Sequence, residues 1–411
     1  MSERTLTPAE ASLSAILDPD HANEPDRVAA LEAFRSRGLP TKRVEAWKWS
    51  DLRASLRAEL AAAPAANDAA PDRTAFTDVP GQEILIENGH VRMTGSLVGP
   101  GFSVIANSGT IGAAGGDDAI ALLNRAHARD GVTLTIDREA VVDDPIILRY
   151  RASAAGASHA RSKLVLGPGA SATVIELYET PAAGAFVNLY TDIELAEGAS
   201  LRRYIVEESA GSAILAAAAN VSAGTGAQYE QAALSAGSHL SRHETYMDFA
   251  GEGARCAISS AFLGDARRHA DFTSLVRHTA PGCETRQEHR AVLDDGARGV
   301  FQGKIKVERP AQKTDGRMTA RALLLDDRSE ANAKPELEIY ADDVECAHGA
   351  TVGALDEEAL FYMRSRGLTE REARALLIDA FLADAFALIS DDAVRAEFAR
   401  LATAMKSGGV E

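Results

Sequence analysis

Five short turns in the middle of this chain each contain a glycine followed by an alanine, and their spacing constrains the fold more than any other feature. The glycines are Gly169, Gly198, Gly226, Gly253 and Gly296, which lie 29, 28, 27 and 43 residues apart. A nearly fixed period of roughly 20 to 50 residues, with strands between glycine turns, is typical of a β-solenoid whose coils pack only on their neighbours. The alternative is an ordinary β-sandwich, because its turns also recur regularly.

Helical patterns flank the β-rich part on both sides. Near the N-terminus, Thr7 and Glu10 form a capping box, and a second helix is expected over 25–37. An Asn88-Gly89 pair between two apolar runs predicts a β-hairpin, and one helix is expected at about 117–129. We therefore predict an N-terminal helical region (1–62), an alanine- and proline-rich linker (63–75), a mixed α/β segment (76–131), a β-helix core (132–353) and a C-terminal helical domain (354–411).

Charge and apolar patterning exclude several classes of protein. The chain has 43 lysines and arginines against 60 aspartates and glutamates, a net charge of −17, whereas nucleic-acid binding depends on cations that neutralise phosphates. We expect no nucleic-acid partner. No apolar run approaches the roughly 20 residues needed to cross a bilayer, and the N-terminus lacks the apolar stretch of a secretion signal. We therefore expect a cytoplasmic protein with no membrane span.

Motifs of nucleotide-binding loops, serine nucleophile elbows and zinc proteases are missing from the sequence. The three cysteines, Cys256, Cys283 and Cys346, form no C-x-x-C pair, so neither a disulfide framework nor a closed zinc site is expected. His239 and His243 are four residues apart, which on a strand is too far for one metal ion. We interpret these two histidines as exposed strand residues.

A β-helical polysaccharide lyase or hydrolase is the alternative from the enzyme class, because such enzymes use clustered acids. The acidic pairs of this chain are adjacent in sequence, so on a strand the two carboxylates would point to opposite faces. These pairs are Asp294-Asp295, Asp326-Asp327 and Asp342-Asp343. The chain also has only two tryptophans to line sugar subsites. The pattern therefore gives the enzyme hypothesis little support.

Near the end of the β-rich part, Cys346 and His348 lie two residues apart and offer two types of soft metal ligand. If residues 344–348 are extended, Cys346 and His348 share a face of the strand with Val344. Thiolate and imidazole suit iron or iron–sulfur species, but a cluster normally takes four protein ligands, so a partner would supply the others. The alternative is a cysteine that packs as a small apolar residue beside a hydrogen-bonded histidine.

A helical pattern returns after residue 354. Thr369 and Glu372 form a second capping box at the start of a long helix. Its apolar stripe consists of Ala373, Leu376, Leu377, Ala380, Phe381 and Leu388. A helix that follows a solenoid either caps the core or presents a surface to a partner, and both uses need an apolar face.

The string Asp-Asp-Val-Glu-Cys-Ala-His-Gly-Ala-Thr at 342–351, with its continuation to Leu368, resembles the C-terminal signature of the SufD members of the SufB/SufD family. This family belongs to the SUF machinery of iron–sulfur cluster assembly. Gly-Lys-Ile-Lys-Val at 303–307, Ala-Gln-Lys-Thr-Asp at 311–315 and Gly-Leu-Pro-Thr-Lys-Arg-Val-Glu-Ala-Trp-Lys-Trp at 38–49 support it. The resemblance covers essentially the whole chain.

The resemblance implies a mainly β protein, with a right-handed parallel β-helix core between N-terminal and C-terminal helical regions. It implies a non-catalytic subunit that pairs with a SufB-like paralogue and a SufC-like ABC-type ATPase to form and transfer nascent clusters. The role of this subunit would be iron entry or ligand provision at the interface with the paralogue. The family also allows a homodimer of the isolated chain.

Site residues follow from the same resemblance. His348 is expected to face a cysteine of the SufB-like partner, with Cys346 close by, and iron or a cluster would bind there only transiently, since the isolated chain holds no stable cofactor. The expected docking helix for the ATPase carries Leu368, Leu376, Leu377 and Phe381. SufB-like chains have a cysteine just after the Gln-Lys-Thr stretch, but residues 316–324 contain none. The sulfur-accepting role is therefore not expected, and a SufB-like scaffold is the alternative.

Overall fold

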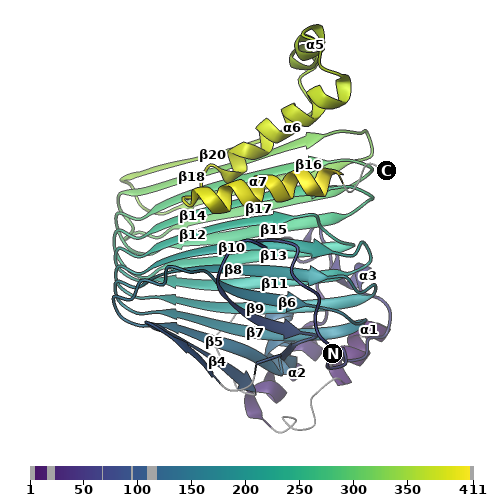
Figure 1. Cartoon of the computed structure of the whole chain (residues 1–411). Coiled ribbons are helices and arrows are strands. Elements are labelled where there is room, and N and C mark those ends of the chain that lie inside the picture. The colour runs from purple at the N-terminus through teal and green to yellow at the C-terminus, as the bar shows by residue number, and fades with distance from the viewer. Residues whose placement is uncertain (1–4, 16–23, 67, 94–95, 109–117, 408–411) are drawn as a thin grey trace.

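A computed structural model of the chain describes residues 5–15, 24–66, 68–93, 96–108 and 118–407. Its strands form two sheets of ten strands each, and consecutive strands of the core alternate between the sheets (Figure 1). Neighbouring strands run parallel, except in the pairs β1–β2, β3–β4 and β4–β5. The chain therefore coils as a mainly β, parallel β-solenoid with helices at both ends, which confirms the fold class predicted from the sequence.

Sheet 1 is the sheet that ends in β20, and sheet 2 is the sheet that ends in β19. In spatial order, sheet 1 contains β2 (His90–Val91), β1 (Gln82–Glu87), β6 (Ile146–Arg151), β8 (Ser171–Thr180), β10 (Ser200–Ser209), β12 (Gln228–Ser235), β14 (Arg255–Gly264), β16 (Glu284–Leu293), β18 (Thr314–Leu324) and β20 (Val344–Gly353). Sheet 2 contains β3 (Ser96–Gly99), β4 (Phe102–Ser108), β5 (Asp130–Ile136), β7 (Gly156–Leu166), β9 (Ala185–Leu195), β11 (Ile214–Ala223), β13 (Leu240–Phe249), β15 (His269–His278), β17 (Arg298–Val307) and β19 (Glu330–Ile339).

Helices lie at both ends of the chain and once between β4 and β5. They are α1 (Pro8–Ala15), α2 (Pro25–Arg37), η2 (Glu45–Trp47), α3 (Leu52–Ser55), α4 (Ala119–His127), α5 (Glu357–Ser365), α6 (Glu370–Phe386) and α7 (Asp392–Ser407). Both predicted capping boxes are confirmed, at Thr7–Glu10 and at Thr369–Glu372. Within the described ranges, no helix combines the length and apolar character needed to cross a membrane.

The segment before the core contributes to the same sheets. The predicted hairpin is confirmed, because β1 and β2 pair in antiparallel fashion with Ile86 opposite Val91. Strand β1 also pairs in parallel with β6, so sheet 1 begins before residue 132, where the core was expected to start. Helix α4 corresponds to the helix expected at about 117–129, although Asp117 itself lies outside the described residues.

Turns that lead from sheet 2 to sheet 1 form a ladder of glycines with positive φ. The φ angles of these glycines lie between 65° and 70°, a conformation that glycine adopts readily because it has no Cβ atom. The N–H of Gly226 donates to the carbonyl of Glu252 at 2.8 Å, and the N–H of Gly253 donates to the carbonyl of Pro281 at 3.0 Å, each in the next coil. The ladder consists of Gly169, Gly198, Gly226, Gly253 and Gly282.

Gly296 is not part of this ladder, contrary to the expectation from its Gly-Ala sequence. It lies between β16 and β17, in a turn that leads from sheet 1 to sheet 2. The fifth member is Gly282, and the residue that follows it is Cys283 instead of alanine. Cys283 is fully buried, as Ala254 is in the preceding coil. The ladder therefore requires a small buried side chain after the glycine, and cysteine meets that requirement as well as alanine does.

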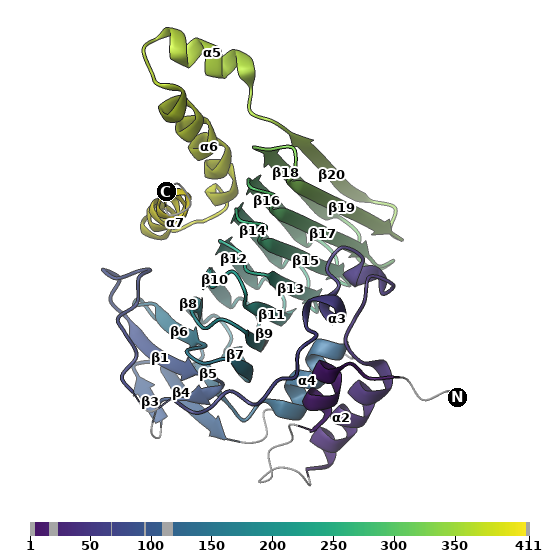
Figure 2. The same ribbon diagram turned by 90° about the vertical axis from the view of Figure 1, so that its right-hand side faces the viewer.

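Different parts of the chain cover the outer faces of the two sheets (Figure 2). Helices α6 and α7 pack on the outer face of sheet 1, where Phe398 of α7 lies 6.1 Å from the ring of Tyr204. Helix α4 and the segment around η2 pack on the outer face of sheet 2. There the ring of Trp47 lies 4.1 Å from the guanidinium carbon of the buried Arg242. The N-terminal segment that contains Trp47 thus covers the buried charge of Arg242.

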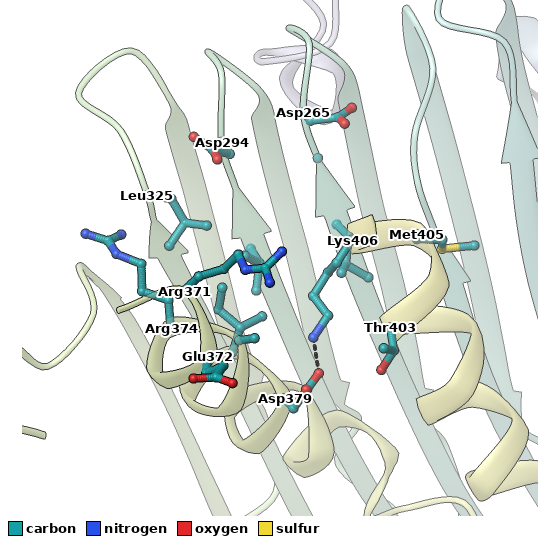
Figure 3. A pocket seen from close by; sticks show the side chains of 15 residues that line it. Asp265, Asp294, Leu325, Arg371, Glu372, Arg374, Asp379, Thr403, Met405 and Lys406 are labelled. Atoms are coloured by element: carbon teal, nitrogen blue, oxygen red, sulfur yellow. Dashed lines mark hydrogen bonds and ion pairs between the residues drawn. The ribbon is translucent and has the colours of Figure 1, made fainter. Parts of the chain in front are cut away.

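A cavity of about 560 Å³ remains between α6, the end of α7 and the turns of sheet 1 (Figure 3). Leu263, Val292 and Ile378 contribute apolar side chains to its wall. Lys406 of α7 forms an ion pair with Asp379 of α6 across it. The two helices are therefore joined over the cavity by charge, while apolar contacts fix them to the sheet.

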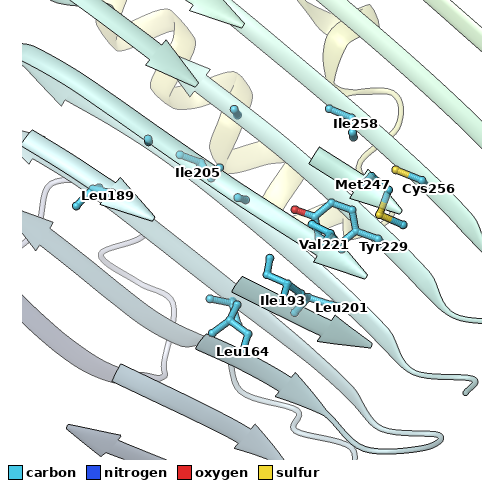
Figure 4. Close-up of a cluster of buried hydrophobic side chains, with 14 of the residues drawn as sticks. Leu164, Leu189, Ile193, Leu201, Ile205, Val221, Tyr229, Met247, Cys256 and Ile258 are labelled. Atoms are coloured by element: carbon cyan, nitrogen blue, oxygen red, sulfur yellow. The ribbon is translucent and has the colours of Figure 1, made fainter. Parts of the chain in front are cut away.

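Alternate side chains of each strand point into the space between the sheets. Figure 4 shows part of this core, in which Leu201 and Ile205 of sheet 1 face Val221 and Met247 of sheet 2. Such alternation is the consequence of the two-residue side-chain period of a strand. Parallel register then stacks equivalent positions in columns that run along the solenoid axis.

Polar side chains also lie inside the solenoid, and His243 is one of them. Its side chain is 7% exposed and its Nε2 lies 2.8 Å from Glu207, so the prediction that His243 is an exposed strand residue is wrong. The imidazole stacks between Tyr178 and Phe272. His239 is exposed, but it precedes β13. Strand parity decides the difference, because residue 243 points inward in the observed register.

Candidate functional site

Strands β19 and β20 are the last strands of their sheets, so each has one edge without a partner strand in the described part of the chain. Most of β20 is exposed, whereas β18 is partly buried and β16 is largely buried. The solenoid is therefore open at its C-terminal end, with its core accessible from that side.

Cys346 and His348 lie on β20 at this open end. Cys346 pairs with Gly316 of β18, and His348 pairs with Met318, whose side chain lies in the core. The two residues therefore share the inward face of β20, as expected for an extended segment. Cys346 is half-buried at the rim of the core, and His348 is exposed.

Glycine at position 316 leaves room for the thiol, because a Cβ atom there would lie 3.4 Å from Sγ of Cys346. Burial raises the pKa of the Cys346 thiol, and a backbone hydrogen bond with Gly316 acts in the opposite direction. A thiol with a raised pKa remains protonated at neutral pH until a metal ion or a positive charge approaches.

The other two cysteines have no access to solvent. Cys256 occupies the same inward column as Cys346, three coils earlier, and burial raises the pKa of its thiol strongly. Cys283 lies in the glycine ladder. Among the residues that the structure describes, no group of three or more histidine, cysteine, aspartate or glutamate side chains is placed to hold a metal ion. Cys346 and His348 are thus two ligands of an incomplete site.

The acidic pairs considered for an enzyme lie in turns. Asp294-Asp295 connects β16 to β17, Asp326-Asp327 connects β18 to β19, and Asp342-Asp343 connects β19 to β20. Asp326 accepts hydrogen bonds from Ser329 and contacts Arg328, which is the ordinary chemistry of a turn. The first two pairs lie in turns from sheet 1 to sheet 2, where Arg328 bridges Asp295 and Asp326, and the third lies in a turn from sheet 2 to sheet 1.

Helix α6 divides the predicted apolar stripe between two faces. Its buried residues are Ala373, Ile378, Leu382, Ala385 and Phe386. Leu377 and Phe381 are half-buried against the core, and Leu368 before the helix is also half-buried, but Leu376 is 48% exposed. The stripe therefore identified the packed face only in part, because Ile378 and Leu382 were not in it and Leu388 lies beyond the end of the helix.

Helix α5 projects away from the sheets (Figure 2), and it carries two exposed aromatic side chains. Phe361 is 74% exposed and Tyr362 is 58% exposed. With Leu376, they give the C-terminal helices an exposed apolar surface, on which the guanidinium carbon of Arg366 lies 5.1 Å from the centre of the Tyr362 ring. Large exposed apolar groups of this kind mark interaction sites.

Arg290 of β16 is a buried arginine that the sequence patterns missed. Its side chain is 3% exposed beneath α6, lies 3.2 Å from Asp384 and is 5.4 Å from the centre of the Phe381 ring. Strand arginines usually point to solvent, so only the placement of α6 identifies this one. Arg290 links the C-terminal helices to the strands that lead to β20.

Comparisons with known proteins agree with this architecture. A family model described as the SufBD core domain of SUF system FeS cluster assembly matches residues 149–381. The iron–sulfur cluster assembly protein SufD of Escherichia coli (strain K12) is 29% identical over 395 residues, which is 92% of each chain. An iron–sulfur cluster assembly SufBD family protein of Synechocystis is 30% identical over 65% of this chain and 61% of its own length. SufD of Bacillus subtilis is 32% identical over 32% of this chain and 30% of its own length.

Proposed function

The chain belongs to the SufBD family of the SUF system of iron–sulfur cluster assembly, and from this premise we propose that it is a non-catalytic subunit that pairs with a SufB-like paralogue and a SufC-like ATPase. One observation carries the proposal. His348 is exposed beside Cys346 on a strand whose edge has no partner in the described chain. A solvent-exposed edge of this length is a template for pairing with another chain.

Ligand provision follows from the chemistry of the two side chains. Imidazole and thiolate both bind iron, which is the cargo of the assembly reaction and not a resident cofactor. Two protein ligands hold iron or a cluster only weakly, so the SufB-like partner supplies the remaining ligands across the interface. Iron or a nascent cluster then binds at His348 and Cys346 transiently, and leaves when the interface changes.

The proposed surface for the ATPase is the exposed side of α5 and α6. Leu376 points outward, Leu377 and Phe381 lie at the edge of the packed face, and Leu368 precedes the helix. Exposed aromatic side chains on α5 extend this surface. Movement of a docked ATPase would reach β16 through the contact between Asp384 and Arg290.

The unpaired edge also accounts for self-association when the chain is isolated. Two copies can pair through β20 in the absence of the paralogue, and the paralogue then displaces one copy. The proposed location is the cytoplasm, because free thiols such as those of the three cysteines are typical of a reducing compartment.

Native mass spectrometry of the chain, co-expressed with the SufB-like and SufC-like proteins of the same genome, tests the proposal. We expect one assembly that contains all three chains, and a homodimer when the chain is expressed alone. Recovery of the chain without either partner, under conditions in which the two partners bind each other, would contradict the proposal.

A further inference from the structure

Arg290 and Arg321 occupy equivalent positions on the outer face of sheet 1. They are register partners in the parallel pairing of β16 and β18, so they lie one coil apart in the same column. Arg290 is buried under α6, where Asp384 and the ring of Phe381 contact its guanidinium group. Arg290 thus shows how an arginine at this position of the column is covered when a helix packs on the sheet.

Arg321 has the same outward position and no such cover. It is exposed, and no described residue forms a hydrogen bond or an ion pair with it. The other outward arginine of β18, Arg317, has a side chain that is 59% exposed and lies 3.3 Å from Asp315 and 3.7 Å from Glu345. Arg321 thus differs from its two neighbours Arg290 and Arg317, each of which contacts a carboxylate.

Arg317 and Arg321 flank a groove of about 380 Å³ between β18 and the exposed face of β20. On β20 the outward positions along this groove are Ala347, Gly349 and Thr351, which are small and exposed. A Cβ atom added at Gly349 would meet nothing within 4 Å. The groove is therefore open above the backbone of β20, and it is continuous with the edge that carries His348.

We propose that this groove docks an acidic, amphipathic helix of the SufB-like partner, which places a carboxylate on Arg321 as Asp384 does on Arg290. The inference rests on the proposed function, because it assigns the partner's position on the same end of the solenoid. Guanidinium and carboxylate groups match in geometry and charge, and the small residues of β20 allow a helix to approach the strand closely. The helix also covers the backbone of the last coil, which the chain's own α6 leaves exposed.

Two substitutions test the groove by independent means. Arg321→Glu reverses the charge, and Gly349→Leu adds bulk at a position where a Cβ atom meets nothing within 4 Å in the isolated chain. Arg255→Glu is the control for charge, since Arg255 is 65% exposed on the same sheet and distant from the groove. Gly211→Leu is the control for bulk, because Gly211 lies in the turn between β10 and β11, several coils from the groove, and a Cβ atom there also meets nothing within 4 Å.

Affinity for the purified SufB-like protein is measured by titration calorimetry on the full-length variants at two salt concentrations. We expect Arg321→Glu and Gly349→Leu to weaken binding by about tenfold or more, whereas the two controls stay within about twofold of the wild type. Thermal unfolding of all four variants should match the wild type. Reversal of one acidic residue on the partner's helix to lysine should restore the affinity of Arg321→Glu.

Each other outcome overturns the assignment. If Arg321→Glu weakens binding but Gly349→Leu does not, long-range attraction and not docking explains the effect. If both variants bind as the wild type does, the groove is not part of the interface, although the proposed function stands. If Arg321→Glu changes only the affinity for an oligonucleotide probe, the class of partner is wrong. If the wild type itself does not bind the SufB-like protein, the proposed function fails as well.

Discussion

Met318 and His348 are register partners on β18 and β20, and both point along the inner face of sheet 1. Met318 is 1% exposed, but His348 is exposed. In the described part of the chain, a further coil stacks on β18 and none stacks on β20, which accounts for the difference. An imidazole that would be a core residue elsewhere in the solenoid is therefore available to a partner here.

Removal of the imidazole should affect assembly and leave the fold intact. Because the side chain is exposed, His348→Ala should change the free energy of unfolding by less than about 0.5 kcal/mol. Cluster assembly by the complex should fall about tenfold or more, because a ligand is lost. Cys346→Ser should have a smaller effect. The check is cluster absorbance on reconstitution, with circular dichroism as the control. A wild-type rate for His348→Ala would contradict the ligand role, and equal losses would indicate joint chelation.

The two faces of α6 should respond differently to a charge. Leu376→Asp changes an exposed side chain, so it should leave thermal unfolding unchanged and weaken binding of the SufC-like ATPase about tenfold. Ile378→Asp places a charge at a residue that is 8% exposed, so it should destabilise the packing of the helix by about 3 kcal/mol. Pull-down of the ATPase with each variant gives the comparison. Normal binding by Leu376→Asp would place the docking surface elsewhere.

Two glycines of one turn should differ in their tolerance of alanine. Gly253 has a φ of 65° and open space around its missing Cβ, so Gly253→Ala should cost about 1 kcal/mol through backbone strain alone. A Cβ atom at Gly251 would overlap the backbone of Thr225 in the preceding coil. Gly251→Ala should therefore cost about 2 kcal/mol or more. Urea unfolding of both variants measures the difference, and the reverse order would show that the coils can separate without penalty.

Buried histidines should make the fold sensitive to acid. Burial lowers the pKa of His289 to about 3 and that of His278 to about 4, against about 6.5 in the unfolded chain. The unfolded state therefore binds more protons below pH 6.5, and stability is lost as the pH falls from there toward these folded-state values. Each neutral histidine contributes a slope of up to about 1.4 kcal/mol per pH unit. His289→Asn should reduce the slope between pH 6.5 and 5, and an unchanged slope would exclude His289 as a contributor.

Much of the fold could be read from local patterns. A positive φ in a tight turn favours glycine, so the ladder from Gly169 to Gly253 was visible as a repeat. Capping boxes at Thr7 and Thr369 depend only on residues three apart, and the shared face of Cys346 and His348 depends only on strand alternation. Such features are set within a few residues, so the sequence by itself determined them.

The tertiary structure decided those features that depend on which coil or helix packs against a residue. Gly282 and Gly296 both occupy glycine turns, and only the path of the chain between the sheets separates them. His243 is buried because the register of β13 turns it toward Glu207. Arg290 is buried and Arg321 is exposed because α6 covers one coil and not the next. Burial is a property of neighbours distant in sequence, and no local pattern contains them.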